Sequence, residues 1–235
     1  MPSFEVKEIA YIRSPFREKF GIPRQSSLCS IESKIVFKNS DDLRQRMTGI
    51  ESSTHFWVIS WLEVGMDRTQ KTKVRAPRFF GKKKIGVYAC RTPDRPYPIG
   101  LSLGKLISVE EASSEFILKM TGLDLLNGSP VIDLKPYLPY CDRVFEADSD
   151  FLKPELYFDV QWNSEVKKII ENYNDKIVDW VEEIIAYDPR PFSQKNKDEF
   201  HLLFENWDFH WRVDGKVARI EKVDWLPVIE QSNRL

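Results

Sequence analysis

Positively charged side chains are concentrated between residues 67 and 95, where the sequence holds ten Lys or Arg and two Asp. Seven of these cations lie between Lys71 and Lys84, and Arg91 and Arg95 follow in a stretch rich in Pro and Gly. Such a composition favours a stiff, shaped loop. Cations on a stiff loop are suited to an anionic ligand. The alternative is a solvated basic loop between two strands.

Further polar side chains lie in Pro- and Gly-rich segments of the N-terminal part. Arg24 and Gln25 follow Pro23 and offer planar donors for a carboxylate, a phosphate or a base edge. Asp124, Asp133 and Asp142 are carboxylates in or beside turn-rich segments. We therefore expect an anionic or nucleotide-like ligand. The net charge of −1 does not exclude nucleic acid, because nucleic acid binds to a local patch of charge.

Several catalytic signatures are missing from the chain. There is no GxGxxG motif, no Gly-Lys-Ser/Thr phosphate loop, no GxSxG and no HExxH. The three His are far apart in sequence, and we expect His55 to be packed or hydrogen-bonded. The three Cys are scattered without zinc spacing, so no metal site is expected. Scattered Cys, no secretory signal and no long apolar run indicate a cytoplasmic protein that does not enter a membrane.

The elements that would position these groups are mostly short strands separated by turns. Asp41–Met47 is expected to form a short helix with Ser40 or Asp41 as N-cap. Asn127-Gly128 predicts a tight turn, and the apolar run Thr54–Leu62 predicts a buried strand. The remaining expected strands are Phe4–Ile12, Ser30–Phe37, Leu101–Val109, Ser114–Met120 and Val131–Lys135. This pattern indicates an antiparallel barrel or sandwich over residues 1–145.

The composition changes near Phe145, and helical periodicity follows. Apolar residues recur at three- and four-residue spacing from Val166 to Ile185, which predicts one long helix or a broken pair, with Ser164 as N-cap. The expected strands beyond it are 200–206, 208–213 and 217–223, the last two joined by a hairpin turn. We therefore expect a small α+β domain over residues 146–235. The fold class as a whole is expected to be mainly β.

Four ordered motifs resemble the TrmO (YaeB, TsaA-like) family. They are RSPF with KFGIPRQ (residues 13–25), VRAPR (74–78), GVYACRTPDRPYPIGLS (86–102) and DLLNGSPVIDLKPY (124–137). The DPRP segment (188–191) and the WRVDG segment (211–215) resemble the family's C-terminal extension. The sequence departs from the family pattern at Glu63-Val64, at Tyr97 and at Asn127.

The resemblance implies a homodimeric, β-barrel tRNA methyltransferase that uses S-adenosyl-L-methionine. Its implied substrate is N6 of threonylcarbamoyl-adenosine beside the anticodon of threonine tRNA. Carried over by motif, the cofactor-binding residues are Pro23, Arg24, Gln25, Glu63, Val64, Arg91, Leu101, Asp124, Leu125, Leu126 and Asn127. Arg91 or Arg95 would pair with the carboxylate of the cofactor or with that of the threonyl group.

Two roles remain to be placed in such an enzyme. The substrate nitrogen must lose a proton, and the candidate acceptors are Asp133, Tyr137 and Asp142. The side chains expected to contact tRNA phosphates are Lys73, Arg75, Arg78, Lys82, Lys83, Lys84 and Arg95. Two other functions remain open: an RNA-binding barrel that has lost the cofactor, and a methyltransferase acting on a small molecule.

Overall fold

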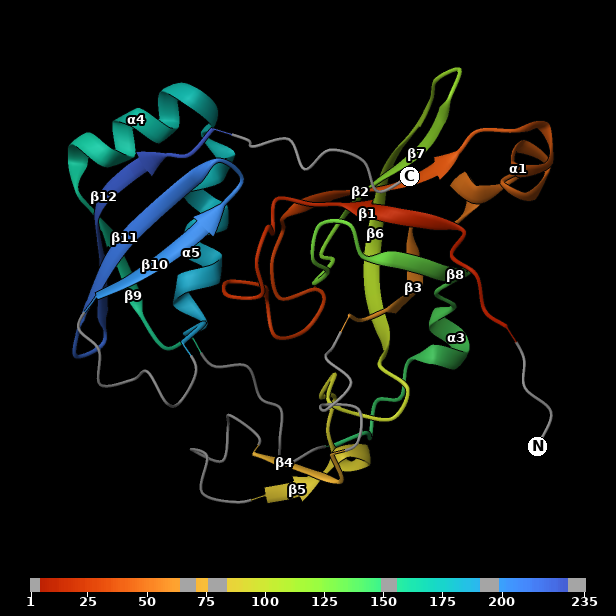
Figure 1. Ribbon diagram of the computed structural model, residues 1–235, viewed down its shortest axis with the longest axis horizontal. Helices are drawn as coiled ribbons and strands as arrows, with labels where there is room; N and C mark the ends of the chain where they lie inside the picture. Colours follow the sequence, from red (N-terminus) through yellow and green to blue (C-terminus); the bar gives the residue numbers. More distant parts are fainter. Residues whose placement is uncertain (1–4, 64–70, 76–83, 149–155, 191–198, 228–235) are drawn as a thin grey trace. The chain divides into compact units, whose positions relative to one another are not determined.

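The computed structural model describes residues 5–63, 71–75, 84–148, 156–190 and 199–227 (Figure 1). The chain divides into two compact units. The N-terminal unit comprises residues 1–14 and 23–154, and the C-terminal unit comprises residues 15–22 and 155–235. Among the described helices, none is long and apolar enough to span a membrane.

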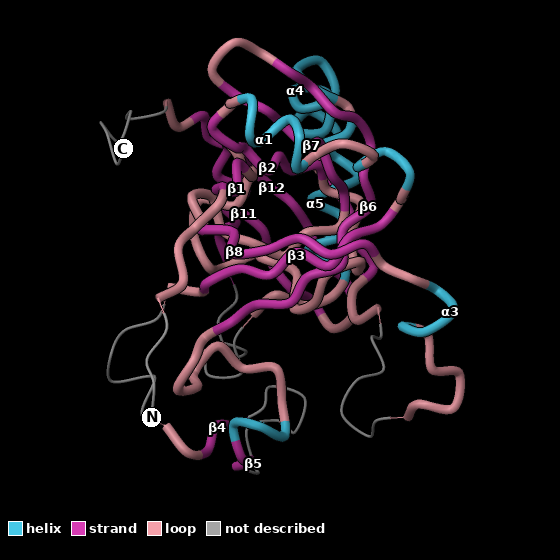
Figure 2. Tube along the Cα trace, turned by 90° about the vertical axis from the view of Figure 1, so that its right-hand side faces the viewer, coloured by secondary structure: helices cyan, strands magenta, loops and turns pink. Residues whose placement is uncertain are grey.

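Six antiparallel strands form a closed barrel in the N-terminal unit, paired in the order β1-β2-β7-β6-β3-β8. The strands are β1 (Ala10–Arg13), β2 (Glu32–Lys38), β3 (His55–Trp61), β6 (Ile99–Glu111), β7 (Glu115–Thr121) and β8 (Pro130–Pro136). Strands dominate the described residues (Figure 2), so the expectation of a mainly β chain is confirmed. The first strand begins at Ala10 rather than at Phe4, and residues 5–8 are irregular.

The barrel core is built by alternation along the strands. In β3, Phe56 and Val58 are buried, whereas Trp57 and Ile59 are only partly covered. The expected strand over 54–62 is confirmed as β3, but it is buried on one face only, with the period of two of an antiparallel sheet that has one inner face. The inner face also holds the polar Ser60.

Short elements connect the barrel strands. Helix α1 (Asp41–Arg46) begins after Ser40, whose Oγ accepts a hydrogen bond from the Leu43 N–H at 3.1 Å. This N-cap confirms the sequence prediction. A one-turn helix η1 (Ile50–Ser52) precedes β3, and α3 (Pro139–Asp142) follows β8.

Part of the basic stretch forms a small hairpin rather than a loop. Strands β4 (Lys73–Arg75) and β5 (Lys84–Gly86) pair antiparallel, and a 3₁₀ turn, η3 (Val87–Ala89), follows them. Each strand has three residues, too few to show the alternation by which a strand is recognised from sequence, so the pattern did not predict them. The side chain of Ile85 is buried, so the hairpin turns one apolar residue inward.

A four-stranded sheet with two helices forms the C-terminal unit. Its strand order is β10-β11-β12-β9, and β9 pairs parallel with β12. The strands are β9 (Asp159–Trp162), β10 (Glu199–Phe204), β11 (Trp207–Asp214) and β12 (Val217–Trp225). Strand β9 was not predicted, because four residues of mixed polarity carry little periodic signal.

The helical stretch is a broken pair, α4 (Ser164–Asn174) and α5 (Lys176–Ala186). The N-cap of α4 is Asn163, whose Oδ1 accepts hydrogen bonds from Glu165 N and Val166 N, so the assignment of Ser164 as N-cap is wrong by one residue. Helix α5 packs against the sheet through Trp180, whose ring lies 6.1 Å from that of Phe204.

Candidate functional site

A buried serine and an aspartate form the centre of the candidate site. Ser102, on β6, is 2% exposed, and its Oγ donates a hydrogen bond to Asp124 Oδ1 at 2.5 Å. Loss of water contact raises the pKa of the Asp124 carboxyl, while the hydrogen bond from Ser102 and the charge of Arg91 lower it. A carboxylate held in this way is a strong acceptor for hydroxyl or amine donors of a ligand.

A left-handed glycine positions Asp124. Gly122 follows β7 with φ +84°, a conformation that glycine adopts without a steric penalty. Its carbonyl accepts a hydrogen bond from Ser27 N at 2.8 Å. A Cβ at Gly122 would be in van der Waals contact with the Ser27 backbone, at 3.5 Å. The turn therefore fixes Asp124 and the segment around Ser27 together.

The segment at residues 25–27 is held against strand β6 and against Arg91. Ser26 Oγ accepts a hydrogen bond from Leu103 N at 3.0 Å, and Ser27 Oγ donates to Leu103 O at 3.2 Å. Arg91 Nη1 donates to Gln25 Oε1 at 2.8 Å. Three segments far apart in sequence thus converge here, around Gln25, Arg91 and Asp124.

Two further site residues were not predicted by the sequence. Ser26 and Ser102 make the hydrogen bonds that align the loop and the carboxylate, yet neither stood out among the serines of the chain. For Ser102 the available signal was a serine at an inward-facing position of an apolar strand, whereas Ser26 lies in a loop. Such a buried hydroxyl needs a partner.

The turn after Asp124 divides its side chains between two environments. Leu125 is 2% exposed and belongs to the barrel core. Asn127 is exposed, and its Oδ1 accepts a hydrogen bond from Ser14 N at 3.1 Å. Gly128, with φ +82°, completes the tight turn that the sequence predicted. Leu126, between Leu125 and Asn127 in the sequence, is partly buried.

The remaining predicted cofactor residues are less closely connected. Pro23 and Arg24 are partly buried, and the Arg24 carbonyl accepts a hydrogen bond from Gln25 Nε2 at 2.5 Å. Leu101 is half-exposed and points to the opposite face of β6 from Ser102. Glu63 is exposed just after β3, and Val64 lies outside the described residues.

The candidate proton acceptors lie on or beside β8 and α3, and two of them contact a tryptophan of β3. Asp133 Oδ2 lies 3.0 Å from Lys135 Nζ. Asp142 Oδ2 accepts a hydrogen bond from Trp57 Nε1 at 3.2 Å, and the Tyr137 ring lies 5.8 Å from the Trp57 ring. Tyr137 and Asp142 therefore gather around Trp57, whereas Asp124 is held by Ser102.

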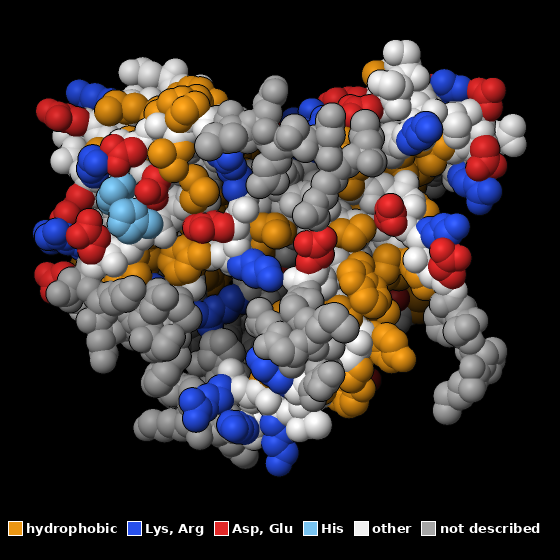
Figure 3. Space-filling view, viewed as in Figure 1, with side chains coloured by type: hydrophobic (Ala, Val, Ile, Leu, Met, Phe, Trp, Pro, Cys, Tyr) orange, Lys and Arg blue, Asp and Glu red, His pale blue; other side chains and the backbone are white. Residues whose placement is uncertain are grey.

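The predicted phosphate-binding cations lie partly on the β4–β5 hairpin. Lys73, Arg75 and Lys84 are exposed, and Arg75 is the strand partner of Lys84. Lys and Arg side chains gather around this hairpin in Figure 3. Arg78, Lys82 and Lys83 lie outside the described residues.

Arg95 has a different environment from the hairpin cations. Its guanidinium donates to the carbonyls of Thr92 at 2.8 Å and Val87 at 3.0 Å, and also to that of Cys90. These bonds brace the loop that carries Arg91.

Both units match models of a known family. The tRNA-methyltransferase O N-terminal domain matches residues 11–143, and the TrmO C-terminal domain matches residues 155–225. The chain is 32% identical over 222 residues to a tRNA (adenine(37)-N6)-methyltransferase of Escherichia coli K12, covering 91% of this chain and 94% of that protein. It is 37% identical over 140 residues to a probable S-adenosyl-L-methionine-binding protein of Methanothermobacter thermautotrophicus, covering 59% and 93%.

Solved structures show the same relationship. A crystal structure of TrmO superimposes with a TM-score of 0.76 at 28% identity, covering 94% of this chain and 99% of that one. A TrmO from Pseudomonas aeruginosa gives 0.75 at 29% identity, covering 96% and 98%. The chain therefore belongs to the tRNA-methyltransferase O family.

Proposed function

We propose that this protein is an S-adenosyl-L-methionine-dependent methyltransferase that modifies N6 of adenosine 37 in tRNA. The observation that carries the proposal is the match to the Escherichia coli tRNA (adenine(37)-N6)-methyltransferase, which extends over both units and nearly the full length of both proteins. The convergence of Gln25, Arg91 and Asp124 supports it, because this arrangement presents a carboxylate and a cation to one ligand.

The residues around Asp124 are suited to S-adenosyl-L-methionine. The Asp124 carboxylate accepts hydrogen bonds from hydroxyl or amine groups, and Arg91 has donors left for a carboxylate. The bound cofactor supplies an electrophilic methyl group. We assign its binding to Pro23, Arg24, Gln25, Glu63, Val64, Arg91, Leu101 and the turn 124–127.

The protein's main contribution to the reaction is positioning. Holding two reactants in line can lower a barrier by about 7–11 kcal/mol. The hydrogen bond that Ser26 accepts from Leu103 N and the one that Ser102 donates to Asp124 hold the loop and the carboxylate in place. The substrate nitrogen also loses a proton, for which we propose Asp133, Tyr137 or Asp142 as acceptor.

We propose threonylcarbamoyl-adenosine next to the anticodon of threonine tRNA as the specific substrate. Its threonyl carboxylate requires a cation, and Arg91 is exposed with most of its donors available. Arg95 is less suitable, because its guanidinium is bonded to backbone carbonyls. We assign the contacts with tRNA phosphates to the basic stretch 73–84. We also propose that the active form is a homodimer and that the protein is cytoplasmic.

Calorimetric titration with S-adenosyl-L-methionine, followed by methyl-transfer assays on threonylcarbamoylated tRNA, tests this proposal. We expect one cofactor site per chain and methylation that depends on the threonylcarbamoyl group. A folded wild-type protein that binds tRNA but not the cofactor would instead be an RNA-binding barrel. Salt-insensitive binding of tRNA would favour a small-molecule substrate.

A further inference from the structure

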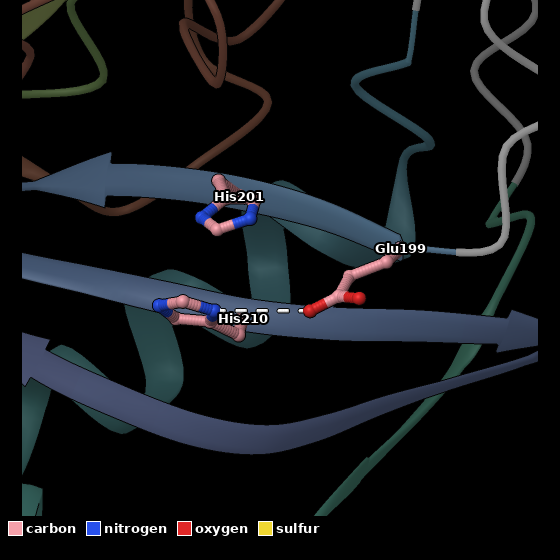
Figure 4. A group of neighbouring side chains, drawn as sticks. All are labelled: Glu199, His201 and His210. Carbon is pink, nitrogen blue, oxygen red and sulfur yellow. Dashed lines mark ion pairs between the residues drawn. The ribbon is translucent and has the colours of Figure 1, made fainter.

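Two histidines and a glutamate lie together on the sheet of the C-terminal unit (Figure 4). Glu199 and His201 are on β10, and His210 is the strand partner of His201 on β11. The two imidazole rings are 4.2 Å apart. One ligand atom from each of the three residues lies within 4.8 Å of the others.

Strand alternation explains why these side chains share the open face of the sheet. Phe200, Leu202 and Phe209 occupy the intervening positions and are buried in the core. The side chain of His201 is 54% exposed and that of Glu199 is 50% exposed, whereas that of His210 is 16% exposed, so the cluster is open to solvent on the side of His201 and Glu199. Figure 3 shows histidine side chains at the surface of this unit with acidic side chains around them.

One nitrogen of each imidazole faces a carboxylate outside the three residues. His201 Nδ1 is 3.1 Å from Asp208 Oδ2, and His210 Nε2 is 2.9 Å from Asp224 Oδ2 and 3.6 Å from Asp208 Oδ2. The nitrogens left for another partner are therefore His201 Nε2 and His210 Nδ1. The latter lies 3.9 Å from Glu199 Oε1, the contact drawn in Figure 4.

This arrangement has the chemistry of a zinc site. Two imidazoles and one carboxylate form a known zinc ligand set, with bonds of about 2.0–2.2 Å. Metal-binding histidines usually have their second nitrogen held by a carboxylate, which fixes the ring and raises its basicity. Asp208 makes such a hydrogen bond with His201, and the Asp224 carboxylate lies at ion-pair distance from His210 Nε2.

We propose that Glu199, His201 and His210 bind one Zn²⁺, with water completing the coordination. Asp208 and Asp224 are positioning residues. Two cations lie nearby: Arg212 Nη2 is 3.5 Å from Glu199 Oε2, and Lys222 Nζ is 2.5 Å from Asp224 Oδ2. Arg212 contacts the second oxygen of the Glu199 carboxylate, and Lys222 contacts the Asp224 oxygen that also faces His210 Nε2. Both cations therefore contact carboxylates of the cluster rather than an imidazole nitrogen. The ion would join β10 to β11 independently of the methyl-transfer site.

The test is calorimetric titration of the metal-stripped full-length protein with ZnCl₂, after alkylation of its three cysteines. We expect one Zn²⁺ per chain in the wild type. The double substitution His201→Asn/His210→Asn should abolish binding, and Asp208→Asn should weaken it about 10- to 100-fold. His55→Asn, the same change at the remaining histidine, should bind as the wild type does.

Circular dichroism and the affinity for S-adenosyl-L-methionine establish that each variant is folded. The proposal is overturned if folded wild-type protein takes up no zinc, or if the double variant binds zinc as tightly as His55→Asn does. If Asp208→Asn lost as much zinc affinity as the double variant, Asp208 would be a zinc ligand and its positioning role would be overturned.

Discussion

Arg91 reaches Gln25, 66 residues earlier in the chain, with a 2.8 Å hydrogen bond from Nη1 to Oε1. This bond joins the loop after the basic hairpin to the loop that precedes β2. Burial raises the pKa of Asp124, and the positive charge of Arg91 opposes that rise. Arg91 therefore interacts with both Gln25 and Asp124.

Replacing Arg91 with Ala should therefore weaken cofactor binding. A hydrogen bond to a charged group contributes about 1.5–3 kcal/mol, so we expect a loss of roughly tenfold or more in affinity. Calorimetry with S-adenosyl-L-methionine measures it. Arg46→Ala, which removes an exposed ion pair with Asp42 on α1, is the control and should leave the affinity unchanged.

Asp124 should give the protein a characteristic dependence of stability on pH. Its pKa is raised in the folded state, so the native protein binds more protons than the unfolded chain between the ordinary and the raised pKa. The free energy of unfolding should fall as the pH rises through that window and level off above it. Denaturant titrations of the wild type and of Asp124→Asn over a pH series measure this contribution.

In Asp124→Asn the free energy of unfolding should lose the pH dependence that Asp124 contributes between its ordinary and its raised pKa. The affinity for the cofactor should also fall. The amide introduced by the substitution can still accept the Ser102 hydrogen bond but carries no charge. An identical slope in both proteins would mean that other groups dominate the titration.

Gly122→Ala should disrupt the site through the backbone. A non-glycine residue at φ +84° costs about 1–2 kcal/mol, and relief of that strain would move the backbone that is bonded to Ser27 N. We expect a lower midpoint of thermal unfolding together with weaker cofactor binding. Gly49→Ala, at φ +81° with nothing within 4 Å, should lower stability without affecting cofactor affinity.

The basic hairpin should account for part of the salt dependence of tRNA binding. Arg75→Ala and Lys84→Ala should each reduce the slope of log affinity against log salt by about 1. Filter binding at several salt concentrations measures the slopes. The same change at Lys168, exposed on α4, tests whether any surface lysine has this effect; an equal reduction there would contradict the assignment.

The local features of the fold were accessible from sequence, because turn and cap signals act over a few residues. Ser40, the Asn127-Gly128 turn and the break between α4 and α5 are examples. The meeting of Gln25, Arg91 and Asp124 depends on the closure of a barrel, which no local pattern encodes. These three residues were assigned through the family motifs instead. Ser26 directly follows the motif residue Gln25 and carries no distinguishing signal of its own. Ser102, inside the third motif, had only the signal of a serine at an inward-facing position of an apolar strand.

The segment 15–22 has a consequence for how the protein is made. It belongs to the C-terminal unit, where Phe16 packs edge-on against Phe204 at 5.9 Å and Pro15 O accepts a hydrogen bond from Glu205 N. During synthesis this segment leaves the ribosome long before its partners exist, so the second unit contains both early and late chain. The C-terminal unit therefore cannot fold completely until β10 has been synthesised. Because it contains residues 15–22 as well as 155–235, cutting the chain at one point cannot separate the two units intact.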